Sequence, residues 1–539
     1  MWYFVGLLIY KHLTPTGVNL LVWMTSTVSK SIRIHRDHKT VNWPAQLLQW
    51  ATIGCLFVFV AFAPHSIAIT QTAWLLGMFF WIARFAFYPR PQLARTPVDY
   101  ALLGFFILTG ISSIFSYEPM ISIGKLRAAS LFTIIYLFAQ NIPSRRLVRL
   151  LALTLVISAA MGTLYTFGER IIGRGIKLGI VAETSPLSAA TWTSDRKTIP
   201  LPVRSGDTVL AVDGKNIREL RELANALTAS AGSDKASIKI YRAEWIATLE
   251  VPRGRLLAGS TPEENLGVAS WQTGRDWRAT GFYGLYVSYA EALQLIMALA
   301  IGMFVSMHTK RSLIGVLWLL IIGAQAFALA LTFTRASWLA FLLSSAVILL
   351  LSASRRLILV AAVIAIPLIL AGLFILQQKR NVGFLDRTDQ STSWRETVWR
   401  EGSALLVSKP RHLLIGVGMD SIKGHWREWG LFDGGRLPWG HMHSNPLQIA
   451  LERGVPALLL WLIFLGVYAR MLWRLARNPA MDDWIERGVV LGALGGLCGF
   501  FVSGLVHYNW GDSEVIMIFY CIVGLTLAIQ RTSLQNRER

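Results

Sequence analysis

Long apolar stretches alternate with short polar segments through most of this 539-residue chain. Each stretch is close to the roughly 20 residues that an α-helix needs to cross the hydrocarbon core of a bilayer. The stretches are continuous, whereas strands of a membrane β-barrel alternate apolar and polar residues. They cover residues 45–65, 67–88, 98–116, 124–141, 146–167, 282–307, 312–333, 336–352, 357–377, 446–470, 488–507 and 514–530. The pattern predicts an all-α polytopic membrane protein with about 12 transmembrane helices, for which the lipid bilayer is the solvent.

The composition supports this class and explains the basic charge. Hydrophobic residues make up 54% of the chain and charged residues only 15%, so few segments can be solvated on all sides. The net charge of +21 is what Lys and Arg retained on cytoplasmic loops produce, and we expect no nucleic-acid partner. Cys55, Cys498 and Cys521 all lie inside apolar stretches, which is typical of small core residues rather than of disulfides or metal ligands.

Lys and Arg are distributed unequally between the two alternating sets of short loops. The set that includes both chain ends holds about 21 of them and the other set about three, and such an excess marks the cytoplasmic side. Both termini are therefore expected in the cytoplasm. The predicted division is a cytoplasmic lead-in (1–44), helices 1–5 (45–167), an outer insertion (168–281), helices 6–9 (282–377), a large outer loop (378–445), and helices 10–12 with a cytoplasmic tail (446–539).

The first outer insertion contains the pattern of a small α+β domain. The segment GDTVLAVDG reads as a strand that ends in a tight Asp-Gly turn, and ASIKIYRAEWIATLEV gives two alternating runs. Between them, Leu220, Leu223, Ala224 and Leu227 have helical spacing. Residues of about 176–252 thus resemble a PDZ domain.

The PDZ resemblance implies a peptide site on the outer, periplasmic side. Backbone N–H groups of Leu178, Gly179 and Ile180 would bind the carboxylate of a peptide or envelope protein, which would add a strand to the sheet edge. The other interpretation is a folded spacer without a ligand.

A second distinctive segment is WGHMHSNPLQIALERG, at the start of the tenth apolar stretch. Asn445 is a good N-cap, Pro446 suits the first helical position, and Gln448 stands where a capping box has its third residue. A span is therefore expected to start at Pro446, with His443 beside the positive end of its helix. That position disfavours imidazolium and favours the neutral ring that a general base needs. The alternative is an interfacial histidine without a catalytic role.

Three segments of the second half resemble the O-antigen ligases and the related O-antigen polymerases. His443-Ser444 followed by nine residues and Gly454 resembles the ligase signature, with Ala457 in place of its second glycine, and Leu447, Gln448 and Glu452 also fit the polymerases. TFTRASWLAFL resembles the family segment that contains an arginine, here Arg335. The remaining matches are Arg395, Trp399, Pro410, Gly416 and Gly418 in the large outer loop, and GLVHYNWGDSEV in the last outer turn.

The resemblance implies a glycosyltransferase of the bacterial inner membrane. It would move a glycan from an undecaprenyl-pyrophosphate carrier to an acceptor hydroxyl on the periplasmic face, most simply O-antigen ligation to lipid A core. The alternative within the family is a polymerase, whose acceptor is another glycan. His443 would be the general base, and Arg335 and Arg395 would bind the pyrophosphate through their planar forks. The simpler interpretation is that Arg335 anchors its helix at the membrane surface and that Arg395 is a solvated charge on the loop.

Other polar residues complete the expected site. His441, His507, Asp512 and Glu514 would orient His443 or bind the acceptor, although the acidic pair could simply cap the last turn. No Asp-x-Asp stands on an outer loop, and two histidines two apart are too few for a metal site, so we expect neither a metal nor another cofactor. A transporter is the alternative from a different class. Transporters usually carry internal repeats and mid-membrane polar sites, and neither pattern is visible here.

Overall fold

The computed structural model describes residues 43–194, 197–229, 233–242, 245–352, 390–437, 440–479 and 481–535, with the isolated positions 356, 359 and 363. Contacts divide the chain into two units, and each is described by itself. The helical unit contains the described residues of 1–159, 291–322 and 335–539, and the insertion unit contains those of 160–290 and 323–334.

Ten helices in the described part of the chain are long and apolar enough to cross a membrane. They are α3 (Trp43–Phe62), α4 with η1 (Ile67–Ala86), α6 to α7 (Pro119–Asn141), α8 (Arg145–Ile172), α11 (Tyr286–Ser306), α12 (Leu313–Leu331), α13 (Arg335–Ser352), α20 (Val455–Ala476), α21 (Trp484–Ser503) and α22 (Ser513–Gln535). A shorter apolar helix, α5 (Asp99–Ile114), occupies the third predicted span, and the predicted span 357–377 lies outside the described residues. The helical polytopic class is therefore confirmed, with ten candidate spans.

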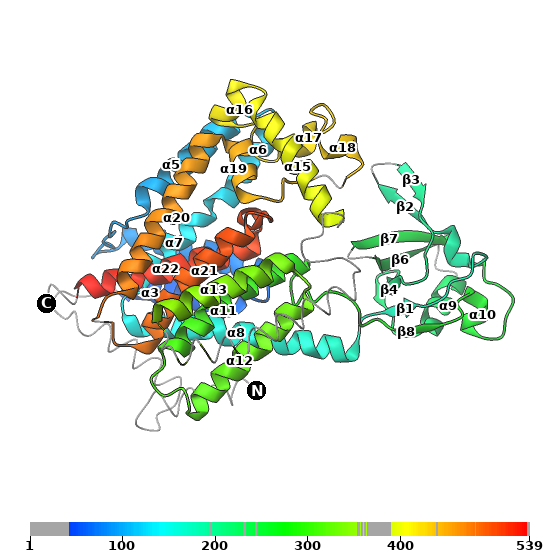
Figure 1. Cartoon of the computed structure of the whole chain (residues 1–539), viewed down its shortest axis with the longest axis horizontal. Coiled ribbons are helices and arrows are strands. Elements are labelled where there is room, and N and C mark those ends of the chain that lie inside the picture. Colours follow the sequence, from blue (N-terminus) through cyan, green and yellow to red (C-terminus); the bar gives the residue numbers. More distant parts are fainter. Residues whose placement is uncertain are drawn as a thin grey trace. The chain divides into compact units, whose positions relative to one another are not determined.

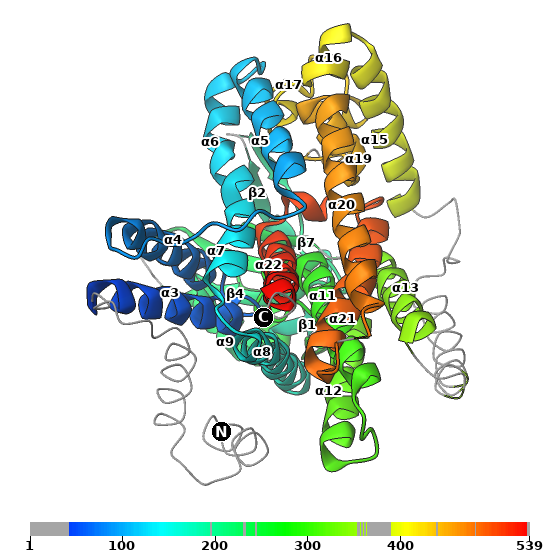
Figure 2. The same cartoon turned by 90° about the vertical axis from the view of Figure 1, so that its left-hand side faces the viewer.

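The helices α11, α21 and α22 lie in the interior of the helical unit (Figure 2). Small residues allow close packing between α11 and α21: a Cβ on Gly302 would lie 2.2 Å from the carbonyl oxygen of Gly488. Peripheral helices instead expose apolar side chains, such as Phe79 and Ile82 on α4, each 62% exposed. That distribution is what a lipid-facing surface requires, because lipid solvates such residues.

The predicted span from Pro446 is wrong at its start, because two helices replace it. Helix α19 (Asn445–Arg453) ends at Gly454, whose φ is +85°, and α20 begins at Val455. A Cβ on Gly454 would lie 2.4 Å from the carbonyl oxygen of Leu414, so another residue would not fit there. The break allows α19 to pack against the large outer loop while α20 runs on as the candidate span.

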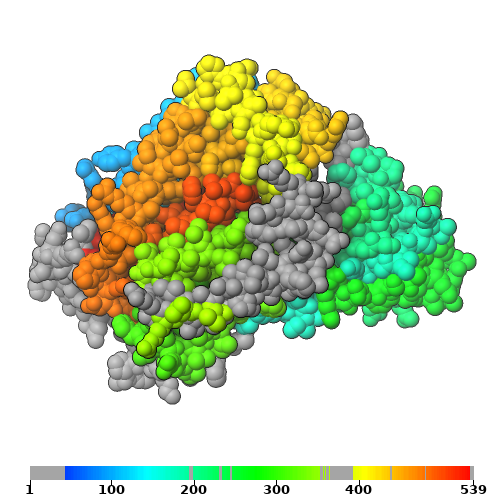
Figure 3. Space-filling view, in the orientation of Figure 1, coloured from blue at the N-terminus to red at the C-terminus, as the bar shows by residue number. Residues whose placement is uncertain are grey.

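Residues 390–435, in the segment predicted as the large outer loop, fold into helices that gather at one end of α5 and α20 (Figures 1 and 2). They are α15 (Gln390–Val407), α16 (Pro410–Ile415), α17 (Ser421–His425) and α18 (Phe432–Gly435). Val398, Phe432, Met442 and Leu451 are fully buried in their shared core. In Figure 3 the segment of α15 to α17, in yellow, lies over the end of the orange α20. This covering layer contains Arg395 and holds the chain on both sides of His443.

The insertion unit contains an antiparallel sheet, as predicted in class. Its strands are β1 (Ile176–Leu178), β2 (Thr191–Ser194), β3 (Lys197–Pro200), β4 (Thr208–Val212), β5 (Lys215–Asn216), β6 (Lys235–Arg242), β7 (Trp245–Pro252) and β8 (Trp271–Thr273). Their order is β3-β2-β7-β6-β4-β1-β8, with β5 on β4. Leu223 and Leu227 of α9 (Leu220–Thr228) pack into the core of the sheet, and the Asp213-Gly214 turn has φ values of +47° and +76°. A further helix, α10 (Pro262–Leu266), precedes β8.

The sheet extends past the predicted boundary at Pro252, because β8 pairs with β1. The fold is thus an inserted antiparallel sheet region, and its identity as a PDZ domain is not established by this topology.

Candidate functional site

The loop that carries His443 is held by hydrogen bonds on both sides of the ring. Trp399 on α15 donates from its indole N–H to the carbonyl oxygen of Met442 at 2.9 Å. The backbone N–H of Met442 donates to Gln448 Oε1 at 2.7 Å. The ring of His443 lies 4.4 Å from that of Trp394 and 4.1 Å from that of His441, measured between centroids. The imidazole is therefore positioned by α15 and α19 together.

The backbone of His443 has φ +48°, in the left-handed region that favours glycine. Such a conformation in a non-glycine residue costs about 1–3 kcal/mol and persists only where the surroundings determine it. Here the two hydrogen bonds of Met442 and the ring contacts of His443 hold the backbone in this conformation. Backbone strain of this kind is typical of functional sites, and its presence at His443 supports a functional role for this residue.

The capping interpretation of Asn445 and Gln448 is wrong. Helix α19 begins at Asn445 itself, with Ser444 as its N-cap residue and no side-chain cap. The side chain of Asn445 bonds to Asn509 Oδ1 at 2.5 Å and accepts the N–H of Trp510 at 3.1 Å. These partners belong to the turn between α21 and α22, and are 64 and 65 residues away in sequence. Asn445 and Gln448 thus tie the His443 loop to its neighbours instead of closing a helix end.

Arg395 lies beside His443, as the resemblance implied. Its Nε donates to the carbonyl oxygen of Val506 at 3.2 Å, which fixes the guanidinium next to the last outer turn. The charge of Arg395 acts on the His443 imidazole strongly enough to lower its pKa. His441 and His507 act on the same ring in the same direction. The structure therefore brings four predicted residues into one group: Arg395, His441, His443 and His507.

Both histidines of the loop are neutral at pH 7. Burial lowers the pKa of His443 far below its ordinary value, and His441 and Arg395 lower it further. Burial, with smaller contributions from Lys423 and His507, lowers the pKa of His441 to about 4. Burial is the largest cause of both shifts, whereas the sequence had indicated the helix start. The neutral imidazole has a lone pair available, but its basicity in the empty site is low.

A buried carboxylate that the sequence analysis missed anchors His507. Glu291 on α11 is 1% exposed and accepts a hydrogen bond from His507 Nδ1 at 2.8 Å. It also accepts from Ser503 at 2.7 Å, from Asn509 at 3.2 Å and from Ser337 at 3.3 Å. The sequence did hold a signal for it, because a carboxylate inside an apolar span is rare unless it is functional or paired.

Arg335 is the first residue of α13. Two residues further on, Ser337 donates to Glu291, which in turn accepts from His507. Asp512 accepts the backbone N–H of Glu514 at 3.2 Å at the start of α22, an arrangement that favours the capping interpretation for this pair. Among the described residues, no group of three His, Cys, Asp or Glu side chains is arranged to hold a metal ion.

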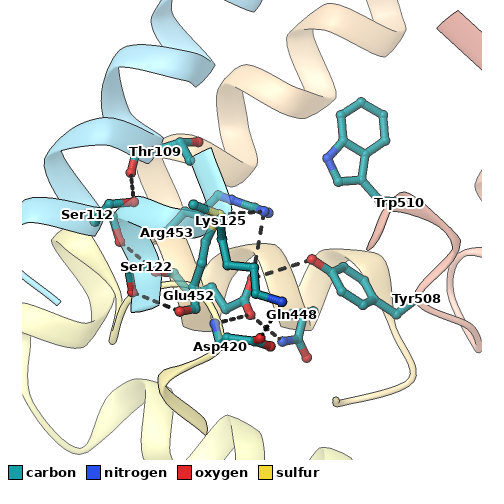
Figure 4. Close-up of polar contacts among 12 residues, drawn as sticks. Thr109, Ser112, Ser122, Lys125, Asp420, Gln448, Glu452, Arg453, Tyr508 and Trp510 are labelled. Atoms are coloured by element: carbon teal, nitrogen blue, oxygen red, sulfur yellow. Dashed lines mark hydrogen bonds and ion pairs between the residues drawn. The ribbon is translucent and has the colours of Figure 1, made fainter. Parts of the chain in front are cut away.

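A cavity of about 260 Å³ lies beside the histidine loop, and His441 contributes to its wall. Its wall includes the polar side chains of Lys125, Asp420, Gln448, Glu452, Arg453 and Tyr508, shown in Figure 4, and that of Lys423. None of these was predicted as a site residue, although Gln448 and Glu452 were noted as part of the family pattern. They are distant in sequence, so only the folded chain shows them together.

The proposed carboxylate loop of the insertion already has internal partners. The N–H groups of Leu178 and Gly179 donate to the carbonyl oxygens of Asp207 at 2.8 Å and Ser270 at 2.7 Å. The N–H of Ile180 donates to Ser270 Oγ at 3.2 Å. Segment 268–273 also runs along this edge of the sheet. A peptide carboxylate would have to displace these contacts, so the geometry favours the spacer interpretation.

Residues 319–462 match the family model described as O-antigen ligase. The matched segment includes Arg335, Arg395, His441 and His443, and ends within α20. The match covers this segment alone and does not separate a ligase from a polymerase. The insertion lies outside the matched residues. No curated protein sequence matches the chain.

Proposed function

We propose that the protein transfers a glycan from undecaprenyl-pyrophosphate to an acceptor hydroxyl on the periplasmic face, and that the acceptor is lipid A core. The observation that supports this most is the group formed by Arg395, His441 and His443 within the matched segment. It combines a cation suited to phosphate with a neutral imidazole, which are the two functions that the reaction needs.

In this mechanism His443 accepts the proton of the acceptor hydroxyl while the oxygen attacks the anomeric carbon. The bond between that carbon and the pyrophosphate oxygen breaks, and the leaving group is the undecaprenyl pyrophosphate. Arg395 and Arg335 bind the pyrophosphate and stabilise the charge that grows on it. The proton on His443 passes to solvent after the new glycoside has left.

Because the pKa of His443 is low without donor, the donor would have a second role, which is to raise the pKa of this base. Burial and the cationic influence of Arg395 disfavour imidazolium. A pyrophosphate bound at Arg395 adds negative charge nearby, which offsets that influence and raises the pKa of the ring. The base would therefore become effective when the donor is in place, and this would limit proton transfer without substrate.

Glu291 and His507 would act as positioning residues. The carboxylate accepts from His507 Nδ1, which orients the ring of His507. The network also joins α11, α13 and α21 at the level of the site. The arginines and histidines lie at helix ends and in the covering layer, which favours a surface transferase over a transporter.

The ligase rather than the polymerase is proposed because of the His443-Ser444 and Gly454 spacing. Deletion of the gene followed by electrophoresis of glycolipids tests the choice. Loss of a ligase leaves polymer that is not attached to lipid, whereas loss of a polymerase leaves core with one repeat. Unchanged glycolipids in the deletion strain would contradict both the ligase and the polymerase function.

The outer location of the site is also part of the proposal. Single cysteines at Asp433 and Asn478, in a background without the native cysteines, would be treated with an impermeant thiol reagent in intact spheroplasts. The Lys and Arg distribution predicts labelling at position 433 and none at 478. The reverse pattern would place the site in the cytoplasm and contradict the mechanism.

A further inference from the structure

The cavity beside the histidine loop has a polar end and an apolar end. Lys125 on α6 and Lys423 on α17 lie at its entrance, with side chains 48% and 45% exposed. Asp420 bonds to both lysines, at 2.7 and 2.9 Å. Burial would raise the pKa of this carboxyl, but the two lysines more than offset burial, and its pKa lies below the ordinary value. The entrance therefore carries two cations and one anion.

Arg453 forms the buried wall of the polar end. Its side chain is 7% exposed, and its guanidinium lies 5.5 Å from the centroid of the Phe105 ring. Nη2 faces Met419 Sδ at 3.4 Å and a Glu452 oxygen at 3.7 Å. Nε and Nη1 have no hydrogen-bond partner among the described residues. Buried donors without partners are costly, so an anion in the cavity would stabilise this side chain.

Glu452 does not supply the missing acceptors, because its oxygens have other partners. Oε1 accepts from Gln448 Nε2 at 2.9 Å and from the N–H of Asp420 at 3.0 Å (Figure 4). Oε2 accepts from the Tyr508 hydroxyl at 3.4 Å. With three cationic and two carboxylate side chains in its wall, the cavity has an excess of positive charge.

The apolar end of the cavity adjoins Arg453 at Phe105 and consists of aromatic and aliphatic side chains. They are Leu102, Phe105, Phe106, Phe132, Trp510 and Tyr520. The volume of about 260 Å³ is near the lower limit of ligand pockets, which is roughly 300 Å³. It suits a small headgroup and the first part of one chain better than a whole sugar. The α5 residues in this lining belong to an apolar helix that also exposes Leu103 and Ile107, so a chain could continue toward lipid.

We propose that this cavity binds the anionic headgroup of an amphiphile, a phosphate or carboxylate joined to an apolar chain. Arg453 binds the anion at depth, Lys125 and Lys423 attract it at the entrance, and the aromatic end holds the chain. The site adjoins the transfer site through His441 but uses other cations than the pyrophosphate site proposed at Arg335 and Arg395. Two sources have the required chemistry: the isoprenoid carrier lipid and an acyl-chain lipid.

Binding of short soluble amphiphiles to the purified full-length protein tests the proposal. Native mass spectrometry in neutral detergent would compare dihexanoyl phosphatidic acid, dihexanoyl phosphatidylcholine and farnesyl phosphate. The first two share their chains and differ in headgroup charge. We expect phosphatidic acid to bind at least tenfold more tightly than phosphatidylcholine. Tighter binding of farnesyl phosphate would assign the site to the carrier lipid, and tighter binding of phosphatidic acid would assign it to an acyl-chain lipid.

Variants identify the residues responsible. Arg453→Met should remove the preference for the anionic headgroup, and Lys125→Gln with Lys423→Gln should weaken it several-fold. Lys215→Gln, which removes an exposed lysine of β5, is the matched control and should bind like wild type. His443→Asn should also bind like wild type, so failure of the transfer mechanism and failure of this site are distinguishable.

Two results would overturn the proposal. One is equal affinity of the wild-type protein for phosphatidic acid and phosphatidylcholine. The other is an unchanged preference in Arg453→Met. If Arg453→Met does not fold, the double lysine variant decides, because its half-exposed side chains are not needed for folding. An unchanged affinity for phosphatidic acid in that variant would then reject the site.

Discussion

The replacement of Glu291 by glutamine tests the network beneath the site. Oε1 accepts from His507 and Ser337, and Oε2 accepts from Ser503 and Asn509. Glutamine keeps the shape but exchanges one of these acceptors for an NH₂ group. The side chain can turn that group toward Ser503 and Asn509, because both also donate to the carbonyl oxygen of Phe500, at 3.2 Å each. A buried donor left without a partner costs about 1–3 kcal/mol, and we expect a cost of about that size for Glu291→Gln.

Thermal unfolding of the purified protein in detergent measures this effect, with Glu514→Gln as the control. Glu514 is partly exposed at the start of α22. We expect a clear decrease in Tm for Glu291→Gln and almost none for Glu514→Gln. Transfer activity of Glu291→Gln, measured below its Tm, should also fall because His507 loses its anchor. Equal unfolding temperatures for the two variants would refute the inferred network.

The remaining predictions concern donor binding, the base and the insertion. Arg395→Lys keeps the charge but loses the fork, so affinity for the lipid-pyrophosphate donor should fall at least tenfold, and donor titration with Arg400→Lys as control would show this. A general base is inactive when it is protonated. Because the pKa of His443 is lowered before the donor binds, protonation of His443 should not reduce kcat/KM for the donor between pH 8 and pH 5. If bound donor raises the pKa of the ring, kcat should decrease on acidification at a higher pH than kcat/KM does. A decrease of kcat and kcat/KM at the same pH would contradict the proposed role of the pyrophosphate. Replacement of residues 176–273 by a flexible linker should leave transfer by purified protein measurable, since the matched segment lies outside them; an inactive but folded variant would show that the sheet belongs to the site.

Much of the fold could be predicted from hydropathy and alternation, because these patterns depend on local sequence. Ten predicted spans coincide with candidate spans, and the strands around the Asp213-Gly214 turn are where alternation indicated. The start of the tenth span could not be predicted in the same way. Asn445 and Pro446 are good helix-start residues, but the amide of Asn445 is used by Asn509 and Trp510. Only the packing of the last outer turn reveals that use.

The candidate site also combines residues that could be predicted from local sequence with residues that only the folded chain brings together. Arg395 and His443 were predicted from short motifs, and the structure brings them together. Glu291 was missed although a carboxylate in an apolar stretch was visible. Arg453 and Lys125 carried no local signal, since one ends α19 and the other belongs to α6, more than 300 residues earlier in the chain. Their convergence depends on long-range contacts that neither periodicity nor spacing encodes.

Glycan transfer by purified protein with His443 replaced is the most direct test of the central claim. His443→Asn is the appropriate variant, because asparagine tolerates φ +48° better than alanine and lacks a basic ring. General-base catalysis contributes about 10²–10⁴-fold, so transfer from undecaprenyl-pyrophosphate glycan to lipid A core should fall by that factor while donor affinity is retained. His441→Asn, which alters the neighbouring ring, is the control and should lose less activity. Wild-type transfer by a folded His443→Asn protein would contradict the account.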